Sequence, residues 1–347
     1  MDNNFTCSIC KKEYVLDFNY KKHITEKHSD LVENILNYDD DDVNITKPII
    51  KWVGGKTQII KKIIYNFPTK INNYHEIFVG GGSVLLALLS YKEKGYIDIT
   101  GDINVYDINK PLISLYKNIQ SNPLELYDCI QVLISEFNNS LDNKPINRLP
   151  LNLIEAMDNK ENYYFWIRSN YNKLTEDEKN SIIGSSMFVF LNKTCFRGVF
   201  RLGPHGFNVP YGNYKNPEII NKEHLFEIHK LIQSVNFICA DFEVSLGDIN
   251  DVNDFIYLDP PYAPETKTSF VKYTEKGFDI EMHKKLFDIL NKLTDNENKF
   301  LLSNADVSLV RENFTSDVYN IEKILCKRSI NSKNPESKTT EVLIKNY

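Results

Sequence analysis

Short apolar runs alternate with longer amphipathic segments along most of the chain from Pro48 onward. A short apolar run bounded by turn residues is typical of a buried strand, whereas apolar positions repeating at helical spacing predict a helix. Strands that alternate with helices indicate an α/β fold built on a parallel sheet. Strands are expected at residues 74–79, 104–108, 237–240, 255–258 and 300–303, and helices at residues 84–90 and 282–293.

This alternation stops between about Leu115 and Asn221, where the pattern predicts a long and mostly helical stretch. Within it, residues 196–214 are punctuated by Gly and Pro, which is typical of a hairpin. We interpret residues of about 115–222 as an insertion into an α/β domain that occupies residues 48–347.

The segment before Pro48 has a different composition. Residues 1–29 are dense in Lys, His and Cys, and residues 30–47 include four consecutive aspartates, Asp39 to Asp42. An acidic block of this kind is usually a solvated linker. We therefore expect a small N-terminal module, then an acidic linker with few contacts, and then the large domain.

Composition excludes some classes of protein. The 347-residue chain has no run of about 18 apolar residues, so a membrane protein is not expected. It lacks a basic segment followed by an apolar stretch at its start, and its six cysteines suit a reducing compartment, so we expect an intracellular protein. The net charge of −6 argues against a surface that binds nucleic acid everywhere, but it leaves room for a local basic face.

The N-terminal module carries four residues with the spacing of a tetrahedral zinc site: Cys7, Cys10, His23 and His28. The spacing Cys-x2-Cys-x12-His-x4-His resembles the two-Cys, two-His zinc finger, a small ββα unit. Tyr14 and Tyr20 stand where that family keeps its core side chains. Zn²⁺ would supply the folding free energy that so small a unit lacks. Fingers of this kind suggest a eukaryotic or viral setting, with the nucleus, the cytoplasm or a viral factory as the location.

Zinc binding does not by itself establish that the finger reads DNA. If the helix is aligned as in the family, its base-facing positions are Leu16, Asn19 and Lys22. Asn19 and Lys22 suit the edges of adenine and guanine, whereas Leu16 offers no hydrogen bond. The alternative is a finger that contacts a protein partner, or only phosphates through Lys21 and Lys22.

The tetrapeptide Asp259-Pro260-Pro261-Tyr262 follows an apolar run, so Asp259 is expected at the carboxyl end of a strand, where α/β sheets hold their active sites. Two prolines stiffen this turn. The Asp259 carboxylate and the Pro260 carbonyl are acceptors beside the ring of Tyr262, an arrangement that suits the exocyclic amine of a planar base. Alone, the motif is equally consistent with an ordinary exit from a strand.

A glycine turn after residues 74–79 closes one strand and opens a helix, which permits close approach of a ligand to the backbone. The dinucleotide fingerprint fails, because its third glycine would fall at Leu85. The P-loop pattern is also absent, because it would need a glycine at position 50, where the chain has Ile50. Asp107 ends the next predicted strand, where an acid can accept hydrogen bonds from ribose hydroxyls.

Several motifs in order resemble those of the Dam-like DNA adenine N6-methyltransferases of the alpha class, in which a target-recognition domain interrupts the catalytic one. The resemblance runs from about Pro48 to Tyr347 and implies a Rossmann-like fold that binds S-adenosylmethionine. Two further segments, residues 192–198 and 207–214, resemble the recognition hairpin of that family. The motifs are residues 51–56, 78–83, 107–109, 239–242, 259–262 and 303–304.

The resemblance implies a role for each matching residue. Asp259 and Pro260 would accept hydrogen bonds from the target amine, and Tyr262 would stack on an adenine flipped out of double-stranded DNA. Asp107 would take the ribose of the donor, and Asp241 with Phe242 would take its adenine. Alternatively, Trp52 and Phe242 are core aromatics, Asp107 and Asp241 are helix caps, and Lys56 lies on a solvated face. The residues implied to hold S-adenosylmethionine are Trp52, Lys56, Phe78, Gly80, Gly82, Asp107, Asp241 and Phe242.

The recognition hairpin is implied to contact DNA through Arg197, Arg201, His205, Asn208 and Pro210. It is about one residue shorter than the pattern associated with the site GATC, and it has His205 where a Lys or Arg is common. A site similar to GATC is therefore only a starting expectation. The runner-up function is a catalytically inactive DNA-binding protein on the same scaffold. The intact motif at Asp259 favours the enzyme.

Overall fold

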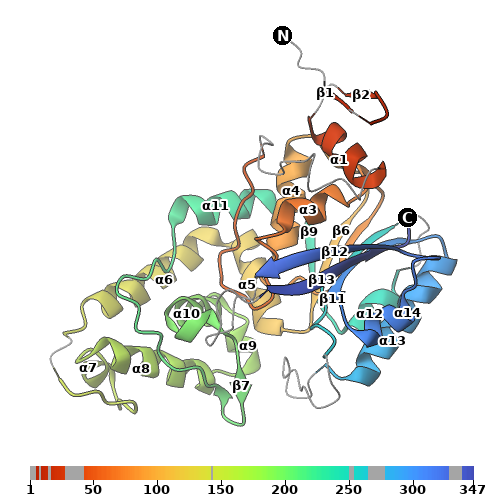
Figure 1. Cartoon of the computed structure of the whole chain (residues 1–347). Helices are drawn as coiled ribbons and strands as arrows, with labels where there is room; N and C mark the ends of the chain where they lie inside the picture. Colours follow the sequence, from red (N-terminus) through yellow and green to blue (C-terminus); the bar gives the residue numbers. More distant parts are fainter. Residues whose placement is uncertain are drawn as a thin grey trace.

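A seven-stranded sheet forms the centre of the protein in the computed structural model of Figure 1. The structure describes residues 5–7, 9–14, 17–27, 43–141, 144–249, 254–264, 278–327 and 338–347. From β11 to β9 the neighbouring strands are parallel, and β13 runs antiparallel to β11 and β12. In order across the sheet, the strands are β12 (Asn320–Lys327), β13 (Lys338–Lys345), β11 (Lys299–Ala305), β10 (Phe255–Leu258), β4 (Tyr74–Glu76), β6 (Ile103–Asp107) and β9 (Val235–Cys239).

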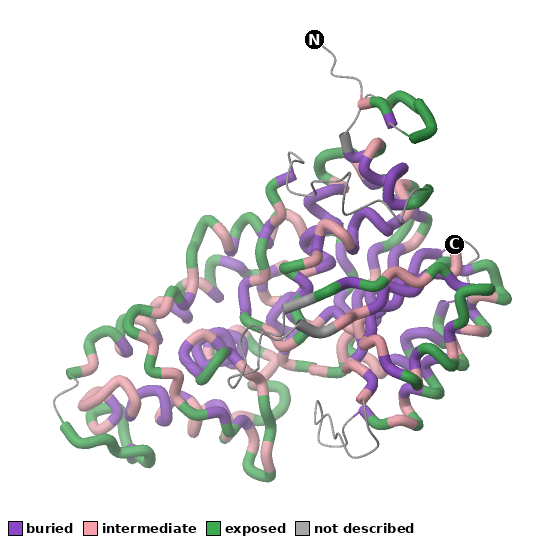
Figure 2. Tube along the Cα trace, in the orientation of Figure 1, coloured by how far each residue is buried: buried purple, intermediate pink, exposed green. Residues whose placement is uncertain are grey.

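Helices cover both faces of this sheet, because alternate residues of each strand point to opposite sides. In β10, Phe255 and Tyr257 join one apolar core, whereas Ile256 and Leu258 join the other. Figure 2 shows that buried residues follow the strands and the facing sides of these helices. The first core is closed by α3 (Ile60–Tyr65), α4 (Ser83–Glu93), α5 (Lys110–Ser121) and α11 (Lys222–Leu231), and the second by α12 (Phe242–Gly247), α13 (Ile280–Asp295) and α14 (Ser308–Asn313).

The five strands and two helices expected from the apolar pattern are present, and the predicted α/β class is confirmed. The pattern missed β12 and β13, in which apolar runs of at most three residues lie among polar and charged ones without regular alternation. It also missed a small parallel pair, β3 (Lys70–Ile71) with β5 (Asp98–Ile99). Within the described ranges, no helix is both long and apolar enough to cross a membrane.

The chain between β6 and β9 forms a helical lobe, which extends to one side of the sheet (Figure 1). Rings of Phe137, Tyr163 and Phe190 pack edge to face or tilted inside it, with centroids 5.4–6.2 Å apart. The first part of the predicted insertion packs on the sheet as α5, so the lobe begins after Ser121. Its elements are α6 (Pro123–Asn138), α7 (Leu153–Ala156), α8 (Lys160–Lys173), α9 (Glu176–Lys179), α10 (Ile182–Thr194), η3 (Phe196–Gly198) and the hairpin of β7 (Leu202–Gly203) with β8 (Gly206–Phe207).

The N-terminal module consists of β1 (Phe5–Thr6), antiparallel β2 (Glu13–Tyr14) and α1 (Asp17–Lys27). We expected few contacts between this module and the large domain, and that expectation is wrong. Phe18 of α1 is 1% exposed and belongs to the first apolar core. Val43 is also buried, and the Thr46 backbone N–H donates to Ser90 Oγ, so the end of the predicted linker packs on the domain. Residues 30–42 of that linker lie outside the described residues.

Candidate active site

The order of the strands identifies the edge of the sheet where a ligand is expected. From β4 the chain continues to β6 and β9 on one side, whereas β10 and β11 lie on the other. Open α/β sheets bind ligands outside the carboxyl ends of the strands at such a switch. Because β4 and β10 are parallel neighbours, the glycine turn after Glu76 and the motif at Asp259 leave the sheet at the same edge.

The glycine turn is too crowded for side chains. Gly80 and Gly82 have positive φ angles of 49° and 74°, which favour glycine. A Cβ at Gly80 would lie 2.9 Å from the indole of Trp52, and one at Gly82 would lie 2.5 Å from the Tyr116 hydroxyl. Tyr116 also donates to the carbonyl of Gly81 at 2.6 Å. Trp52 therefore lies against the turn, and the structure brings these predicted donor-binding residues together.

Asp107 holds the glycine turn to the end of β6. Its Oδ2 accepts from the Gly80 N–H at 3.0 Å, and its Oδ1 accepts from the Asn109 N–H at 2.8 Å. Burial raises the pKa of Asp107 to about 6, although both backbone donors act in the opposite direction. Each carboxylate oxygen has a second lone pair that can accept from a hydroxyl.

The aromatic residues at this edge form one group. The rings of Phe78, Phe242 and Phe278 lie 5.5–6.1 Å apart by centroid. Phe242 is buried in the second core, and Asp241 accepts from the Glu243 N–H at 2.8 Å as the N-cap of α12. Asp241 thus caps α12 and Phe242 packs in the second core, contacts that do not test the predicted donor contacts, and Phe78 is half-buried beside them.

Asp259 and Lys56 form an ion pair at the carboxyl end of β10. The distance from Lys56 Nζ to Asp259 Oδ2 is 2.6 Å, and the Lys56 side chain is 6% exposed. The solvated-face alternative for Lys56 is therefore wrong. The same ammonium donates to the Gly54 carbonyl at 2.8 Å and lies 4.9 Å from the centre of the Tyr262 ring.

The second oxygen of Asp259, Oδ1, differs from the first. Asp259 Oδ1 is buried, and it accepts no hydrogen bond from the part of the chain that the structure describes. Burial raises the pKa of Asp259 to about 6, whereas Lys56 acts to lower it and Glu341 to raise it further. A buried carboxylate oxygen without a donor costs free energy, so this atom is poised to accept a hydrogen bond from a ligand.

The turn at Asp259 is braced by residues that sequence reasoning missed. Tyr262 donates its hydroxyl proton to Glu341 Oε2 at 2.6 Å, which fixes the orientation of the ring. Asn304 Oδ1 accepts from the Ala263 N–H at 3.0 Å, and His283 Nε2 lies 2.9 Å from the Pro261 carbonyl. The sequence contained Ser303-Asn304 as a motif without a role, but it held no signal for Glu341.

Glu76 is a further buried acid at this edge that sequence reasoning missed. It ends β4 directly before the glycine turn and accepts a hydrogen bond from the Tyr74 hydroxyl at 2.8 Å. Burial raises the pKa of Glu76 to about 8, and the nearby charge of Asp259 adds to the rise. A carboxyl with this pKa is mostly protonated at neutral pH.

The predicted DNA-contacting residues of the hairpin are all exposed: Arg197, Arg201, His205, Asn208 and Pro210. Arg201 donates through Nε to Asn208 Oδ1 at 2.7 Å. Arg197 has a φ of 58°, a rare conformation for a residue with a side chain, and its N–H donates to the Tyr214 hydroxyl at 2.8 Å. The stacking of Phe200 on Trp52, with centroids 5.6 Å apart, places the hairpin beside the glycine turn.

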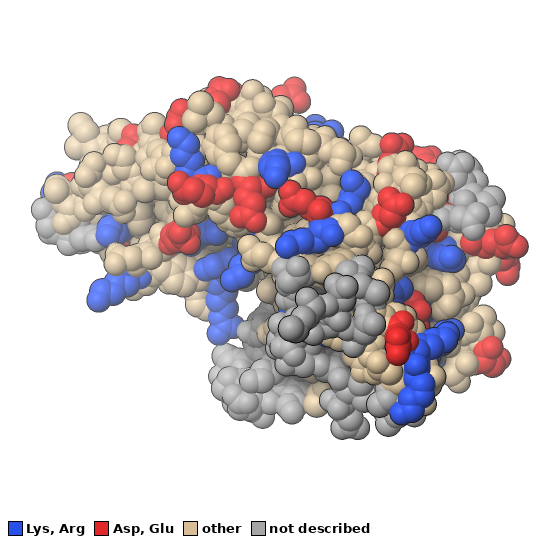
Figure 3. Space-filling model, turned by 90° about the horizontal axis from the view of Figure 1, so that it is seen from above, with Lys and Arg blue, Asp and Glu red and all other residues tan. Residues whose placement is uncertain are grey.

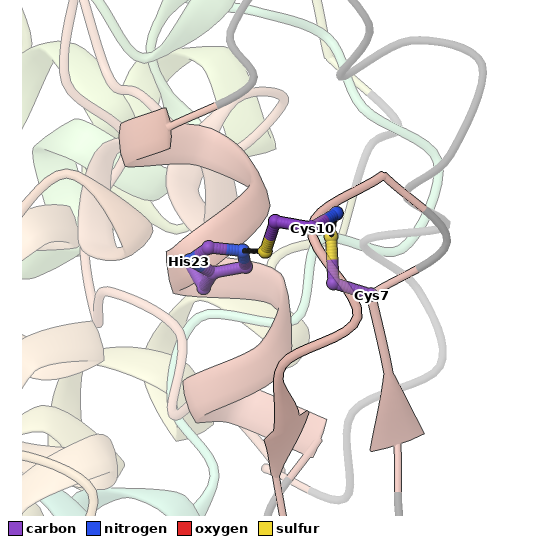
Figure 4. A group of neighbouring side chains, drawn as sticks. All are labelled: Cys7, Cys10 and His23. Atoms are coloured by element: carbon purple, nitrogen blue, oxygen red, sulfur yellow. Dashed lines mark hydrogen bonds between the residues drawn. The ribbon is translucent and has the colours of Figure 1, made fainter.

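The predicted metal ligands of the N-terminal module also meet. The ligand atoms of Cys7, Cys10 and His23 all lie within 4.8 Å of one another, and Cys10 Sγ is 3.1 Å from His23 Nε2 (Figure 4). The ring of Tyr14 packs on that of His23 at 5.1 Å. The fourth predicted ligand, His28, lies outside the described residues.

The two predicted base-reading residues of α1 differ in exposure. Asn19 is exposed, but Lys22 is buried, with Nζ donating to the Phe67 carbonyl and paired with Glu26 at 2.9 Å. The prediction that Lys22 faces DNA is wrong in this arrangement, because the neighbouring domain covers the side chain. Lys21 is buried as well, which removes the expected phosphate contact. Leu16 lies outside the described residues.

Comparison with known proteins agrees with this geometry. Residues 52–330 match the family of D12 class N6 adenine-specific DNA methyltransferases. The Type II methyltransferase M.MjaIII of Methanocaldococcus jannaschii is 36% identical, with the match covering 87% of this chain and 99% of the relative. The DNA adenine methylase of Haemophilus influenzae is 31% identical over 84% of this chain and 90% of the relative. The DNA adenine methylase of Escherichia coli K12 is 28% identical over 87% of this chain and 95% of the relative. The chain belongs to the D12 class of N6 adenine-specific DNA methyltransferases.

Proposed function

We propose that this edge of the sheet catalyses transfer of a methyl group to N6 of an adenine flipped out of duplex DNA, with Asp259 as the central acceptor. One observation carries the proposal: the buried Oδ1 of Asp259 lacks a donor in the described part of the chain, beside the ring of Tyr262. An exocyclic amine on a base that stacks on Tyr262 would supply the missing donor. The Pro260 carbonyl would accept the second N–H of that amine.

The residues across the edge fit S-adenosylmethionine, which supplies an electrophilic methyl group when bound. The crowded turn at Gly80 and Gly82, with the N-terminus of α4, suits the close approach of the amino acid part. Asp107 keeps a lone pair on each oxygen for the ribose hydroxyls. Asp241 and Phe242 would take the adenine, and Trp52 and Phe78 would limit the access of water.

Lys56 has two functions in this proposal. Its ammonium lowers the pKa of Asp259, which keeps the carboxylate ionised and able to accept hydrogen bonds at neutral pH. Because the ammonium also lies over the Tyr262 ring, it occupies the space where the base would stack. We infer that the Lys56 ammonium moves off the ring toward the donor site when the base arrives, and that it keeps its contacts with Asp259 Oδ2 and the Gly54 carbonyl. The predicted donor contact of Lys56 belongs to that second position.

The hairpin of β7 and β8 is proposed to read the sequence around the target adenine. Its cations are exposed and their partners are groups of the same hairpin, so they can exchange those partners for DNA. The strained backbone at Arg197 supports a functional role, because such strain is concentrated at binding sites. A GATC-like site stays a prediction.

The experiment that tests the catalytic proposal is incubation of the protein with S-adenosylmethionine and plasmid DNA, followed by nucleoside mass spectrometry. We expect N6-methyladenine, and modification-sensitive sequencing should locate it at one short sequence. Methylation of cytosine or of RNA instead of DNA would contradict the proposed substrate. Tight binding of DNA and donor without any methylation would favour the inactive DNA-binding alternative.

We also propose that the N-terminal module binds one Zn²⁺ through Cys7, Cys10 and His23, with His28 as the fourth ligand. Two thiolates and two imidazoles are the ligand set that tetrahedral zinc prefers. The three described ligands come from the β1–β2 hairpin and from α1, as in a ββα unit (Figure 4). Elemental analysis should find one zinc per chain in the wild type and none in Cys10→Ser. An equal zinc content in both proteins would contradict the site.

A further inference from the structure

We infer that the N-terminal module, residues 5–27, has the methyltransferase domain of its own chain as its partner, and that zinc bound there stabilises the catalytic domain. The inference rests on the proposed zinc site. It states that the site contributes to the stability of the whole chain, and that α1 does not read DNA bases.

Helix α1 is buried on two sides. One side faces the hairpin and the proposed metal: Tyr20 packs on Phe5 with ring centroids 6.0 Å apart, and His23 packs on Tyr14 at 5.1 Å. The other side consists of Phe18, Lys21, Lys22 and Thr25, which follow helical spacing and are all buried. A helix that only displayed a recognition surface would leave that second side to solvent.

The contact between α1 and the domain is apolar at its centre. The ring of Phe18 lies 5.3 Å from that of Tyr65 in α3, 5.5 Å from that of Tyr91 in α4 and 5.1 Å from that of Tyr96. With 1% of its surface exposed, Phe18 fills a pocket between two helices of the first core. Burial of an aromatic side chain in this way is a large stabilising contribution.

A polar contact connects the same helix to the strands of the active site. Lys22 donates to the backbone carbonyl of Phe67, which follows α3. The ring of Phe67 packs on Tyr74 of β4 and on Phe255 and Tyr257 of β10, at 5.9, 4.7 and 5.6 Å. These are the two strands whose carboxyl ends carry the glycine turn and Asp259. The module therefore supports the amino-terminal side of the sheet and does not approach the site itself.

The charge of the surrounding surface does not favour DNA. Figure 3 views the molecule from above relative to Figure 1, and among the residues drawn in colour on this face the acidic and basic side chains are interspersed. A DNA-binding face would be expected to gather basic side chains. Because Lys22 and Lys21 are also buried, we expect α1 to contribute little to DNA affinity.

Zinc binding and folding are coupled equilibria, and this coupling determines how zinc affects stability. A module of this size buries too little apolar surface to fold alone, so its folding depends on metal binding. A ligand that binds only the folded state stabilises every part of the molecule that unfolds together with its site. If the Phe18 contact makes the module and the domain one cooperative unit, zinc raises the melting temperature of the whole chain.

The test is thermal unfolding of the full chain by calorimetry, with zinc bound and after treatment with a chelator, together with zinc content by elemental analysis. We expect one transition that falls by about 5 to 10 °C on chelation. Phe18→Ala should keep one zinc per chain, melt lower than the wild type by a similar amount, and respond less to the chelator. The milder Lys22→Met should also keep zinc and melt slightly lower, and Asn19→Ala, at the exposed neighbouring position, is the matched control.

Two results would overturn the inference. One is a main transition that is unchanged by chelation while zinc is lost, which would make the module independent of the domain. The other is a fall in DNA affinity for Asn19→Ala, which would make α1 a DNA-contacting helix. Failure of the zinc proposal is distinct: wild-type protein would contain no zinc, whereas Phe18→Ala would still melt lower.

Discussion

The catalytic edge of the sheet and the β7–β8 hairpin hold their charged groups in opposite ways. At the edge, Lys56 is buried and Asp259 and Asp107 are partly buried, and their partners belong to the site itself. On the hairpin, Arg197 and Arg201 are exposed and have only weak surface contacts. A preorganised site stabilises charge without rearrangement, whereas exposed cations can exchange partners when DNA binds. Changes at the edge should therefore alter the rate on every sequence, and changes on the hairpin should alter which sequence is methylated.

Asp259→Ala should produce the largest effect. Loss of the buried acceptor should lower the rate of methyl transfer by about 100- to 10 000-fold on all DNA sequences. Donor affinity should change little, because the proposed donor contacts lie at Asp107 and the glycine turn. Single-turnover rates and donor titrations measure the two quantities separately.

Asp107→Ala is the matched variant for that experiment. It should weaken donor binding, both because the ribose acceptor is lost and because the Gly80 N–H loses its partner. The rate at saturating donor should fall less than in Asp259→Ala. Equal losses of donor affinity in the two variants would contradict this division of roles.

Arg201→Ala should have the next largest effect, and on a different quantity. A guanidinium that makes paired hydrogen bonds to guanine is worth about 1–3 kcal/mol against other bases. We expect methylation to become degenerate at one guanine next to the target adenine, as measured by sequencing of modified DNA. A uniform loss over all sequences, with the salt slope reduced by about one, would instead identify a phosphate contact.

The same two regions differ in how far the sequence predicted them. The strands of the catalytic edge, and the positions of Asp259 and Asp107 at their carboxyl ends, could be predicted, because each strand is a short apolar run that ends at a motif. Supporting residues were missed where the contact depends on distant chain: Glu341 reaches Tyr262 only because β13 inserts antiparallel between β11 and β12. For the hairpin, the residues were predicted, but their DNA contacts remain a prediction.

For the N-terminal module, the sequence predicted that Cys7, Cys10 and His23 lie together, but it missed the docking of the module on the domain. Spacing along the chain is sufficient to suggest that Cys7, Cys10 and His23 meet, because all three belong to one small unit. The pocket for Phe18, in contrast, is formed by Tyr65 of α3 and by Tyr91 and Tyr96 in and after α4, and no local pattern connects them with Phe18. The burial of Lys22 followed from the same docking, since a lysine on a helix is ordinarily expected in solvent.

Lys56→Met should change how the rate of methyl transfer depends on pH. The positive charge of Lys56 lowers the pKa of Asp259, so its removal should raise that pKa above about 6. When ionised, Asp259 offers only acceptors to the amine, whereas protonation turns one of its oxygens into a donor. The rate at saturating donor should therefore fall about tenfold per pH unit below its pKa. We therefore expect the acid limb to move to higher pH in Lys56→Met and to stay in place in Lys56→Arg. An unmoved limb in Lys56→Met would show that another group sets it.

Glu76→Gln should have the smallest effect on activity and a distinct effect on stability, which no residue of the hairpin can reproduce. Folding raises the pKa of Glu76 from 4.5 to about 8, so between these values the folded chain retains a proton that the unfolded chain has lost. The wild type should then lose stability as pH rises, by at most about 1.4 kcal/mol per pH unit, and the loss should end above about pH 8. Gln does not titrate and can still accept from Tyr74, so the variant should gain stability relative to the wild type over this range, while its rate at pH 7 stays within about twofold. Urea unfolding of both proteins at several pH values measures this difference. A difference that is constant with pH would mean that Glu76 is ionised in the folded chain, and that the edge tolerates a second buried negative charge beside Asp259.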